Sequence, residues 1–314
     1  MPEAKVIVTC PPMLGLIDEF RPLFAERGVT LCCAPVIQTM SERELMAVLP
    51  GFDGWIIGDD PATRPVLAAG AAGRLRAIVK WGVGIDNVDF AAAAEFGLDA
   101  VNTPGVFGRE VADLAMHYVT GLARETYHID REIRLNGGWP KPPGLSLADK
   151  VVGLIGFGDI GRNVARRLLA ADMAVRVYDP AYRDTGDLPI LANPAWPNGI
   201  EQCDFLVFTA PLNPSTRHMF RRPVLPRVKP GVRIVNVGRG PVIEEAALVA
   251  GLQSGAIHSV ALDVFETEPL GPGNALRQYP LNIFGSHNAS NTRDAVRRVS
   301  HLAIERLFGF LGIA

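Results

Sequence analysis

Residues 151–161 read Val-Val-Gly-Leu-Ile-Gly-Phe-Gly-Asp-Ile-Gly, and this stretch decides the expected fold. Its apolar, β-branched first half is typical of a strand buried in a parallel sheet. The strand runs into a GxGxxG pattern, and apolar residues then recur at three- and four-residue spacing, as on one face of a helix. Such glycines permit a tight turn, close approach of the backbone to a pyrophosphate, and close packing of helix on strand. Because the helix start also offers N–H groups to an anion, the stretch predicts a dinucleotide site formed by Gly156, Gly158, Asp159, Ile160 and Gly161.

The segment after this helix indicates which dinucleotide binds. A second apolar run, residues 174–178, ends at Asp179, which lies 18 residues after Gly161. An acidic residue at this place accepts hydrogen bonds from the adenosine ribose hydroxyls and would repel the 2′-phosphate of NADP. A GxGxxG pattern alone is weak evidence, since many glycine-rich turns only make a corner. Strand, pattern, helix, strand and terminal acid in this order predict NAD as the cofactor.

Composition sets the class of protein. The chain has 314 residues, which is long for one domain and indicates two. Its net charge of −2 gives no sign of a nucleic-acid or membrane partner, and no apolar run reaches transmembrane length. The four cysteines follow no metal-ligand spacing, and we see no signal peptide. We therefore expect a cytoplasmic protein that holds no metal.

The order of strand-like and helix-like segments predicts an α/β protein of two doubly wound parallel-sheet domains with a cleft between them. Residues 1–104 alternate such segments without a nucleotide pattern, so they should form a flavodoxin-like substrate domain, joined by the last helix within 289–314. Residues 105–288 should form a Rossmann NAD domain, opened by one long helix over 110–131. The Asn-Thr-Pro-Gly sequence at 102–105 is the expected hinge.

Polar or glycine-rich residues follow each later strand of the NAD domain. In open α/β sheets, ligands bind at the carboxyl ends of the strands. Residues after the strands at 205–208, 233–237 and 259–262, and the corner at 285–287, should therefore converge on the cofactor. The members we expect to contact it are Thr209, Ala210, Pro211, Thr216, Val237, Gly238, Arg239, Asp263 and His287.

Residues 81–89 follow a strand of the first domain and read Trp-Gly-Val-Gly-Ile-Asp-Asn-Val-Asp. Two glycines after a strand expose backbone N–H groups that can hold a carboxylate. A plain strand-to-helix turn, capped by Asp86 or Asn87, explains the same residues equally well. The residues alone leave both interpretations open.

Hydride transfer to a ketone needs a proton donor, a cation for the carboxylate and carbonyl, and a group that tunes the donor. Arg239, between two glycines at a strand end, is a suitable cation. His287 follows a strand, and Glu268 would favour its protonated form if the two were adjacent. Each residue also has an ordinary explanation, as a surface arginine, a structural histidine or a loop carboxylate.

Several motifs together resemble the NAD-dependent D-isomer-specific 2-hydroxyacid dehydrogenases, of the phosphoglycerate dehydrogenase-like kind. Besides the glycine pattern and the loop at 82–89, they are Asn236-x-x-Arg239-Gly240, Asp263-x-Phe265-x-x-Glu268-Pro269, and His287 with Thr292. The match covers nearly the whole chain in the order of the family. The resemblance implies that Arg239 binds the substrate carboxylate and carbonyl, that His287 is the acid/base, and that Glu268 is its partner.

The resemblance has further implications for ligands and partners. It implies that Val83 and Gly84 give N–H groups to the substrate carboxylate and that Asp263 touches the nicotinamide amide. It also implies a homodimer formed through the NAD domain. The chain ends at Ala314, so we expect no added regulatory domain of the kind found in some phosphoglycerate dehydrogenases.

The chain also departs from the family pattern. Relatives often have Ser-Val-Ala-Glu where residues 110–113 read Glu-Val-Ala-Asp, which puts the local helix start in doubt. Residues 58–61 read Gly-Asp-Asp-Pro, where phosphoglycerate-specific relatives tend to carry a phosphate-binding arginine. Asp59 and Asp60 would add negative charge to the site if they lie near the distal end of a substrate, although Lys80 could still meet a phosphate.

We therefore expect an NAD-dependent D-2-hydroxyacid dehydrogenase acting on a small uncharged 2-oxo acid such as glyoxylate or hydroxypyruvate. Its predicted substrate-binding residues are Lys80, Val83, Gly84, Arg239 and His287. A D-3-phosphoglycerate dehydrogenase is the alternative within the family. A non-catalytic NADH-sensing scaffold, like the co-repressors built on this fold, is the alternative of another class. A formate-type dehydrogenase pairs its histidine with glutamine, so Glu268 argues against it.

Overall fold

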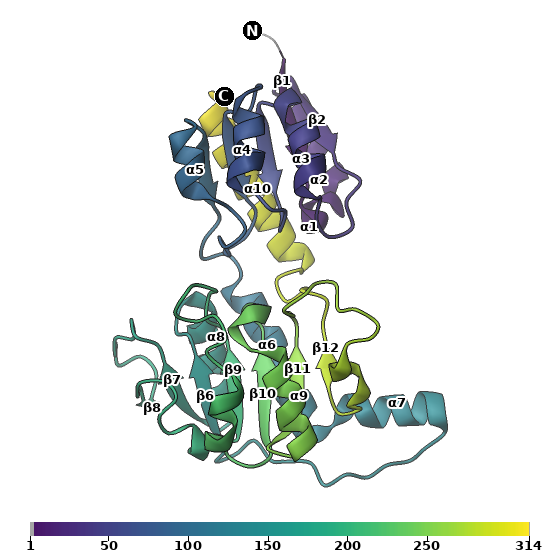
Figure 1. Ribbon diagram of the computed structural model, residues 1–314, viewed down its shortest axis with the longest axis vertical. Helices are drawn as coiled ribbons and strands as arrows, with labels where there is room; N and C mark the ends of the chain where they lie inside the picture. Colours follow the sequence, from purple (N-terminus) through teal and green to yellow (C-terminus); the bar gives the residue numbers. More distant parts are fainter. Residues whose placement is uncertain (1–2, 314) are drawn as a thin grey trace. The chain divides into compact units, whose positions relative to one another are not determined.

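The computed structural model describes residues 3–313, which divide into two compact units (Figure 1). The first unit contains residues 3–107 and 291–313, and the second is Gly108–Ser290. Each unit is a parallel sheet with helices, which confirms the predicted fold class. Among the residues described, no helix is both long enough and apolar enough to cross a membrane.

The first unit has a five-stranded parallel sheet in the order β2-β1-β3-β4-β5. Its central strands β3 and β4 are buried along their whole length, which explains their unbroken apolar sequences. Ile57 pairs with Lys80, so the segments that follow β3 and β4 leave the same edge of the sheet side by side. The strands are β1 (Ala4–Val8), β2 (Val29–Cys33), β3 (Gly54–Ile57), β4 (Ala77–Lys80) and β5 (Asp99–Asn102).

Seven helical segments belong to the first unit: α1 (Pro11–Leu14), α2 (Ile17–Ala25), α3 (Glu42–Val48), η1 (Leu49–Gly51), α4 (Arg64–Ala71), α5 (Phe90–Glu95) and α10 (Arg293–Leu311). The Ser-x-x-Glu sequence at Ser41 and Glu44 is typical of a capping box, and it forms one at the start of α3, where each backbone N–H donates to the side chain of the other. Helix α10 packs on β3 and β4 although it comes from the far end of the chain. The Trp81 indole N–H donates to the Ser300 hydroxyl at 3.1 Å and ties α10 to the end of β4.

The second unit has a seven-stranded parallel sheet in the order β12-β11-β10-β9-β6-β7-β8. Strand β6, which carries the glycine pattern, lies between β9 and β7. Its neighbours come from different directions along the chain, so β6 ends at the point where the strand order reverses. The strands are β6 (Val151–Ile155), β7 (Ala174–Tyr178), β8 (Ile190–Ala192), β9 (Phe205–Phe208), β10 (Val232–Asn236), β11 (Ile257–Leu262) and β12 (Ile283–Phe284).

The helical segments of the second unit are α6 (Gly108–Arg124), α7 (Thr126–Asn136), α8 (Asp159–Ala170), η2 (Ile200–Gln202), η3 (Arg222–Arg227), η4 (Gly240–Val242), α9 (Glu245–Ser254) and η5 (Ala275–Gln278). The prediction of one helix over 110–131 is wrong. Glu125 has a φ of 52° and separates α6 from α7. The Leu122 and Ala123 carbonyls instead accept hydrogen bonds from Arg233 Nε and the Leu145 N–H. These partners are remote in sequence, so periodicity within the helix gives no sign of the break.

Gly73 and Gly51 offer a matched test of packing in the first unit. A Cβ on Gly73 would lie 2.4 Å from the Pro50 carbonyl oxygen and 2.5 Å from Pro50 Cα, whereas a Cβ on Gly51 would meet nothing within 4 Å. Gly73→Ala should lower the free energy of unfolding by about 1–3 kcal/mol, the usual cost of overpacking. Gly51→Ala should hold or slightly raise it, because alanine restricts the unfolded chain. Urea unfolding measures both, and equal stability of the two variants would contradict this packing.

Candidate active site

The glycine turn joins β6, α8 and the segment after β9. Gly156 has a φ of 94°, which only glycine adopts readily, and a Cβ there would lie 2.8 Å from the Ala210 nitrogen. A Cβ on Gly161 would lie 2.2 Å from the Gly156 carbonyl oxygen. The Thr209 hydroxyl donates to that same oxygen at 3.0 Å. Backbone atoms therefore enclose the turn at Gly156 and Gly161, where Thr209 and Ala210 support it from the neighbouring strand.

Asp179 lies at the edge of the same turn. It follows β7, and its carboxylate accepts hydrogen bonds from the Phe157 N–H at 2.6 Å and the Ala181 N–H at 2.7 Å. Phe157 is inside the glycine pattern, so the acid is held against the turn by the backbone. A carboxylate has about four acceptor sites, which leaves Asp179 acceptor capacity for ribose hydroxyls.

The loop after β10 is shaped by a buried side chain. The Asn236 amide oxygen accepts from the Gly238 N–H at 3.0 Å, and its NH₂ group donates to the Arg239 carbonyl at 3.0 Å. The Arg239 guanidinium donates to the Gly238 carbonyl. A Cβ on Gly240 would lie 1.8 Å from the Phe265 carbonyl oxygen, so this loop contacts the segment after β11 directly. Asn236 thus sets the backbone that carries Arg239, a role that the sequence indicated only by its place in a motif.

His287 and Glu268 form the pair that the sequence could only pose as a hypothesis. His287 Nδ1 lies 2.8 Å from Glu268 Oε2, and both side chains are about one-fifth exposed. Glu268 Oε1 accepts the Phe265 N–H, which fixes the carboxylate. An ionised carboxylate only accepts hydrogen bonds, so Nδ1 carries the hydrogen. Nε2 is therefore the ring nitrogen that can take up or release a proton in a reaction.

Asp263 organises the turn that carries His287. The residue is 1% exposed, and its carboxylate accepts hydrogen bonds from the Asn288 N–H at 3.1 Å and the Ala289 N–H at 2.8 Å, while its backbone carbonyl accepts the His287 N–H at 2.7 Å. Burial raises the pKa of Asp263. A Cβ on Gly285 would lie 2.1 Å from Asp263 Oδ1 and 2.4 Å from the Tyr118 hydroxyl. Tyr118 lies on α6, far from Asp263 and Gly285 in the sequence, and no local pattern indicated this contact.

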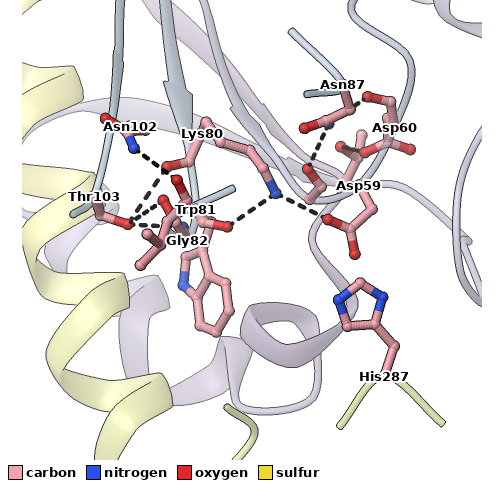
Figure 2. Close-up of polar contacts among 12 residues, drawn as sticks. Asp59, Asp60, Lys80, Trp81, Gly82, Asn87, Asn102, Thr103 and His287 are labelled. Carbon is pink, nitrogen blue, oxygen red and sulfur yellow. Dashed lines mark hydrogen bonds and ion pairs between the residues drawn. The ribbon is translucent and has the colours of Figure 1, made fainter. Parts of the chain in front are cut away.

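In the first unit, backbone hydrogen bonds of Gly82 and Val83 hold the loop after β4 in place. Gly82 exchanges hydrogen bonds with Thr103, and the Asn102 amide donates to the Val83 carbonyl at 3.0 Å (Figure 2). Within residues 3–313, the N–H groups of Val83 and Gly84 donate to no acceptor. Two consecutive N–H groups are thus available to an anion, as the nest interpretation expects.

The alternative interpretation of this loop named the wrong cap. Helix α5 is capped by Asp89, whose carboxylate accepts the Ala92 N–H at 2.9 Å, and not by Asp86 or Asn87. The Asn87 amide instead donates to the Gly58 carbonyl at 3.1 Å and the Asp60 carbonyl at 2.7 Å. Asn87 therefore joins the segments that follow β3 and β4.

The charged residues beside this loop differ from expectation. Asp60 is fully buried and accepts from the Thr9 hydroxyl and the Met40 N–H, and burial raises its pKa. The expectation that Asp60 adds charge near the substrate is wrong, because its side chain enters the core of the unit. The Lys80 side chain is also buried, and its ammonium contacts Asp59 at 3.0 Å and donates to the Trp81 carbonyl (Figure 2).

A known protein family matches the part of the sequence that contains the glycine turn, Arg239, Glu268 and His287. The family model described as D-isomer specific 2-hydroxyacid dehydrogenase, NAD binding domain, matches residues 116–289, more than half of the chain. The chain belongs to the D-isomer specific 2-hydroxyacid dehydrogenases. It is an NAD-dependent dehydrogenase of this family, which transfers a hydride between NAD(H) and a 2-hydroxy or 2-oxo acid. The predicted family, cofactor and class of reaction are therefore confirmed.

Relatives of this 2-hydroxyacid dehydrogenase carry several names. A hydroxypyruvate reductase of Thermotoga maritima is 36% identical over 281 residues, which cover 87% of this chain and 90% of that protein. D-3-phosphoglycerate dehydrogenase 2, chloroplastic, of Arabidopsis thaliana is 35% identical over 276 residues, covering 87% of this chain and 44% of that protein. Among solved structures, an NADPH-dependent glyoxylate/hydroxypyruvate reductase from Sinorhizobium meliloti, in complex with NADP and malonate, has a TM-score of 0.83. Its sequence identity is 28%, with 98% of this chain and 94% of that one covered.

Two glycines of the turn should separate folding from cofactor binding. Gly161→Ala places a methyl group against the Gly156 backbone and should lower stability by about 1–3 kcal/mol or more. A Cβ on Gly158 meets no protein atom within 4 Å, so Gly158→Ala should keep the melting temperature. It should nevertheless raise the Kd for NADH at least about tenfold, because the second glycine permits close approach to the pyrophosphate. Thermal unfolding and NADH fluorescence titration measure the two effects. A Gly158→Ala protein that binds NADH like the wild type would contradict this division of roles.

Proposed function

We propose that this dehydrogenase reduces a small 2-oxo acid to the D-2-hydroxy acid, reversibly, with His287 as its acid/base. The observation that carries the proposal is the 2.8 Å contact between His287 Nδ1 and Glu268 Oε2, with Glu268 itself fixed by the Phe265 N–H. Bound NADH supplies the hydride. His287 Nε2 gives its proton to the oxygen that was the ketone, and Glu268 stabilises the imidazolium before that transfer.

We assign the substrate carboxylate and carbonyl to Arg239, whose planar guanidinium suits such a group. The Val83 and Gly84 N–H groups are further donors to the carboxylate, which is supported by their having no acceptor within residues 3–313. We assign the cofactor to the glycine turn and the ends of its neighbouring strands, that is to Gly156, Gly158, Asp159, Ile160, Gly161, Asp179, Thr209, Ala210, Pro211, Thr216, Val237, Gly238, Arg239, Asp263 and His287.

The preferred substrates are small uncharged 2-oxo acids such as glyoxylate and hydroxypyruvate. This is supported by Lys80, whose ammonium is buried and held by Asp59 and the Trp81 carbonyl. An ammonium so engaged is a poor ligand for a substrate phosphate. The name of the Thermotoga maritima relative agrees with this choice.

We also propose that the protein is a cytoplasmic homodimer formed through the second unit. Helix α7 has no buried residue, and it exposes Tyr127, Ile133 and Leu135, with Trp139 just beyond it. Exposed apolar side chains in such a group are typical of a protein interface. The four cysteines are free thiols, as in proteins of a reducing compartment.

Removing the imidazole tests the function directly. His287→Ala should lower kcat for reduction of glyoxylate or hydroxypyruvate by about 10²–10⁴, the usual contribution of general acid–base catalysis, while NADH still binds. Glu268→Gln should keep the fold and move the alkaline limb of the kcat/KM profile for reduction to lower pH, because an amide does not favour imidazolium. His301→Ala, at an exposed histidine on α10, is the control. Turnover of His287→Ala within about twofold of the control would exclude His287 as the acid/base.

Cofactor preference is a separate prediction. NADH should exceed NADPH in kcat/KM by about a hundredfold, since apposed like charges cost several kcal/mol. The similar fold of an NADPH-dependent reductase does not decide the matter, because Asp179 and not the fold meets the 2′ position. Asp179→Ser should lower the ratio of kcat/KM with NADH to kcat/KM with NADPH. Asp184→Ser changes an exposed acid in the next loop and should leave this ratio as in the wild type. Equal kcat/KM for both cofactors in the wild type would overturn the role of Asp179.

A further inference from the structure

We propose that Asp59, positioned by Lys80, selects substrates by the group on C3 of the 2-oxo acid. Its carboxylate favours a hydrogen-bond donor there, such as a hydroxyl, and repels an anionic group such as phosphate. Asp59 is then a specificity residue and Lys80 a positioning residue. This inference rests on the proposed function and names the substrate class for the same site.

The ion pair lies beside the N–H groups assigned to the substrate carboxylate. Ile57 at the end of β3 pairs with Lys80 at the end of β4, so Asp59 and Gly82 leave neighbouring strands at one edge of the sheet. Lys80 Nζ donates to the Trp81 carbonyl at 3.3 Å, and Trp81 directly precedes Gly82. The pair and the loop that begins at Gly82 are therefore in contact.

The two loops are also fixed to one another. Asn87, within the substrate loop, donates hydrogen bonds to the carbonyls of Gly58 and Asp60, one on each side of Asp59 (Figure 2). Asp60 is anchored in the core through the Thr9 hydroxyl and the Met40 N–H. The backbone that carries Asp59 is thus held on both sides, as a residue that reads substrate shape requires.

The pair is exposed on one side only. The Lys80 side chain is 4% exposed and the Asp59 side chain is 39% exposed. A buried ammonium needs a counter-charge, and Asp59 provides it together with the Trp81 carbonyl. What this pair presents to a ligand is therefore carboxylate oxygen and not ammonium.

The chemistry of the substrate follows from this arrangement. C3 of a 2-oxo acid is attached to the carbonyl carbon, which is itself attached to the carboxylate. A carboxylate held by the Val83 and Gly84 N–H groups keeps the C3 substituent close to the same loop. A hydroxyl on C3 can donate to Asp59, and hydrogen bonds to a carboxylate are stronger than those to neutral acceptors. A phosphate there meets a like charge, so the site selects against it.

The test compares kcat/KM with NADH for pyruvate, hydroxypyruvate and 3-phosphohydroxypyruvate. The wild type should prefer hydroxypyruvate over both of the other acids. In Asp59→Asn, the ratio of 3-phosphohydroxypyruvate to pyruvate should rise at least about tenfold, and the ratio of hydroxypyruvate to pyruvate should fall. Asp99→Asn makes the same chemical change at the amino end of β5, at the opposite edge of the sheet, and should keep both ratios and the activity.

Substitution of Lys80 should change the substrate ratio in the direction opposite to substitution of Asp59. Lys80→Met leaves the Asp59 charge uncompensated, so the ratio of 3-phosphohydroxypyruvate to pyruvate should fall below the wild-type value. A purely structural lysine would lower all three activities in parallel. Because either single variant leaves one charge of a buried pair alone and can fail to fold, the double variant Asp59→Asn/Lys80→Met removes both charges. It should show the same raised ratio of 3-phosphohydroxypyruvate to pyruvate as Asp59→Asn. Melting temperatures of all variants show whether each one is folded.

The outcomes separate this inference from the proposed function. Unchanged substrate ratios in Asp59→Asn and in the double variant, or a wild type that prefers 3-phosphohydroxypyruvate, would overturn the role of Asp59 and leave the reduction of 2-oxo acids intact. A folded wild type that reduces none of the three acids nor glyoxylate would overturn the proposed function and this inference together.

Discussion

The second unit depends on how closely α8 approaches the end of β6. A Cβ on Gly161 would lie 2.2 Å from the Gly156 carbonyl oxygen, so the helix can begin where it does only because Gly161 lacks a side chain. That approach brings the positive end of α8 to the edge of the sheet where β6 and its neighbours end. Thr209 and Asp179 are fixed to the same turn by hydrogen bonds to its backbone. Close packing of backbone, rather than any one side chain, thus creates the proposed cofactor site.

Buried carboxylates hold the loops in both units. Asp263 binds the backbone around His287, and Asp60 binds Thr9 and Met40 beside the substrate loop. Burial raises the pKa of each, and the hydrogen bonds that each accepts act in the opposite direction. The reacting groups proposed here, His287 and the Val83 and Gly84 N–H groups, lie on loops and not within helices or strands. Loops are often mobile, and the hydrogen bonds of the buried acids hold these loops in one conformation. Residues on the loops can therefore keep the fixed positions that catalysis and binding require.

Two acidic residues that are adjacent in the sequence differ in burial. Asp59 and Asp60 are adjacent, yet Asp59 is partly exposed with Lys80 as its partner, and Asp60 is in the core. A similar contrast holds for Lys80, a charged residue at the end of a fully buried strand. Its charge is tolerated because Asp59 and a carbonyl surround it. The charge that these loops present to solvent therefore depends on the burial of Asp60 and Lys80 and the partial exposure of Asp59, and not on the net charge of the segment.

His287, Glu268 and Arg239 were singled out through the resemblance to a family, but local patterns in the sequence were sufficient for the fold class, the glycine turn and the capping box at Ser41. Each depends on residues within one or two elements, where period, turn chemistry and order along the chain carry the information. The break at Glu125, the inward turn of Asp60, the bracing by Asn236 and the contact of Tyr118 with the Asp263 region were not predictable in this way. Their partners, such as Arg233 and Leu145 for the end of α6, are distant in sequence and meet only when the sheet forms. Sequence by itself determined which chemistry this protein carries, while the tertiary structure decided which charges are buried and which remain exposed, because burial is a property of the packed neighbours.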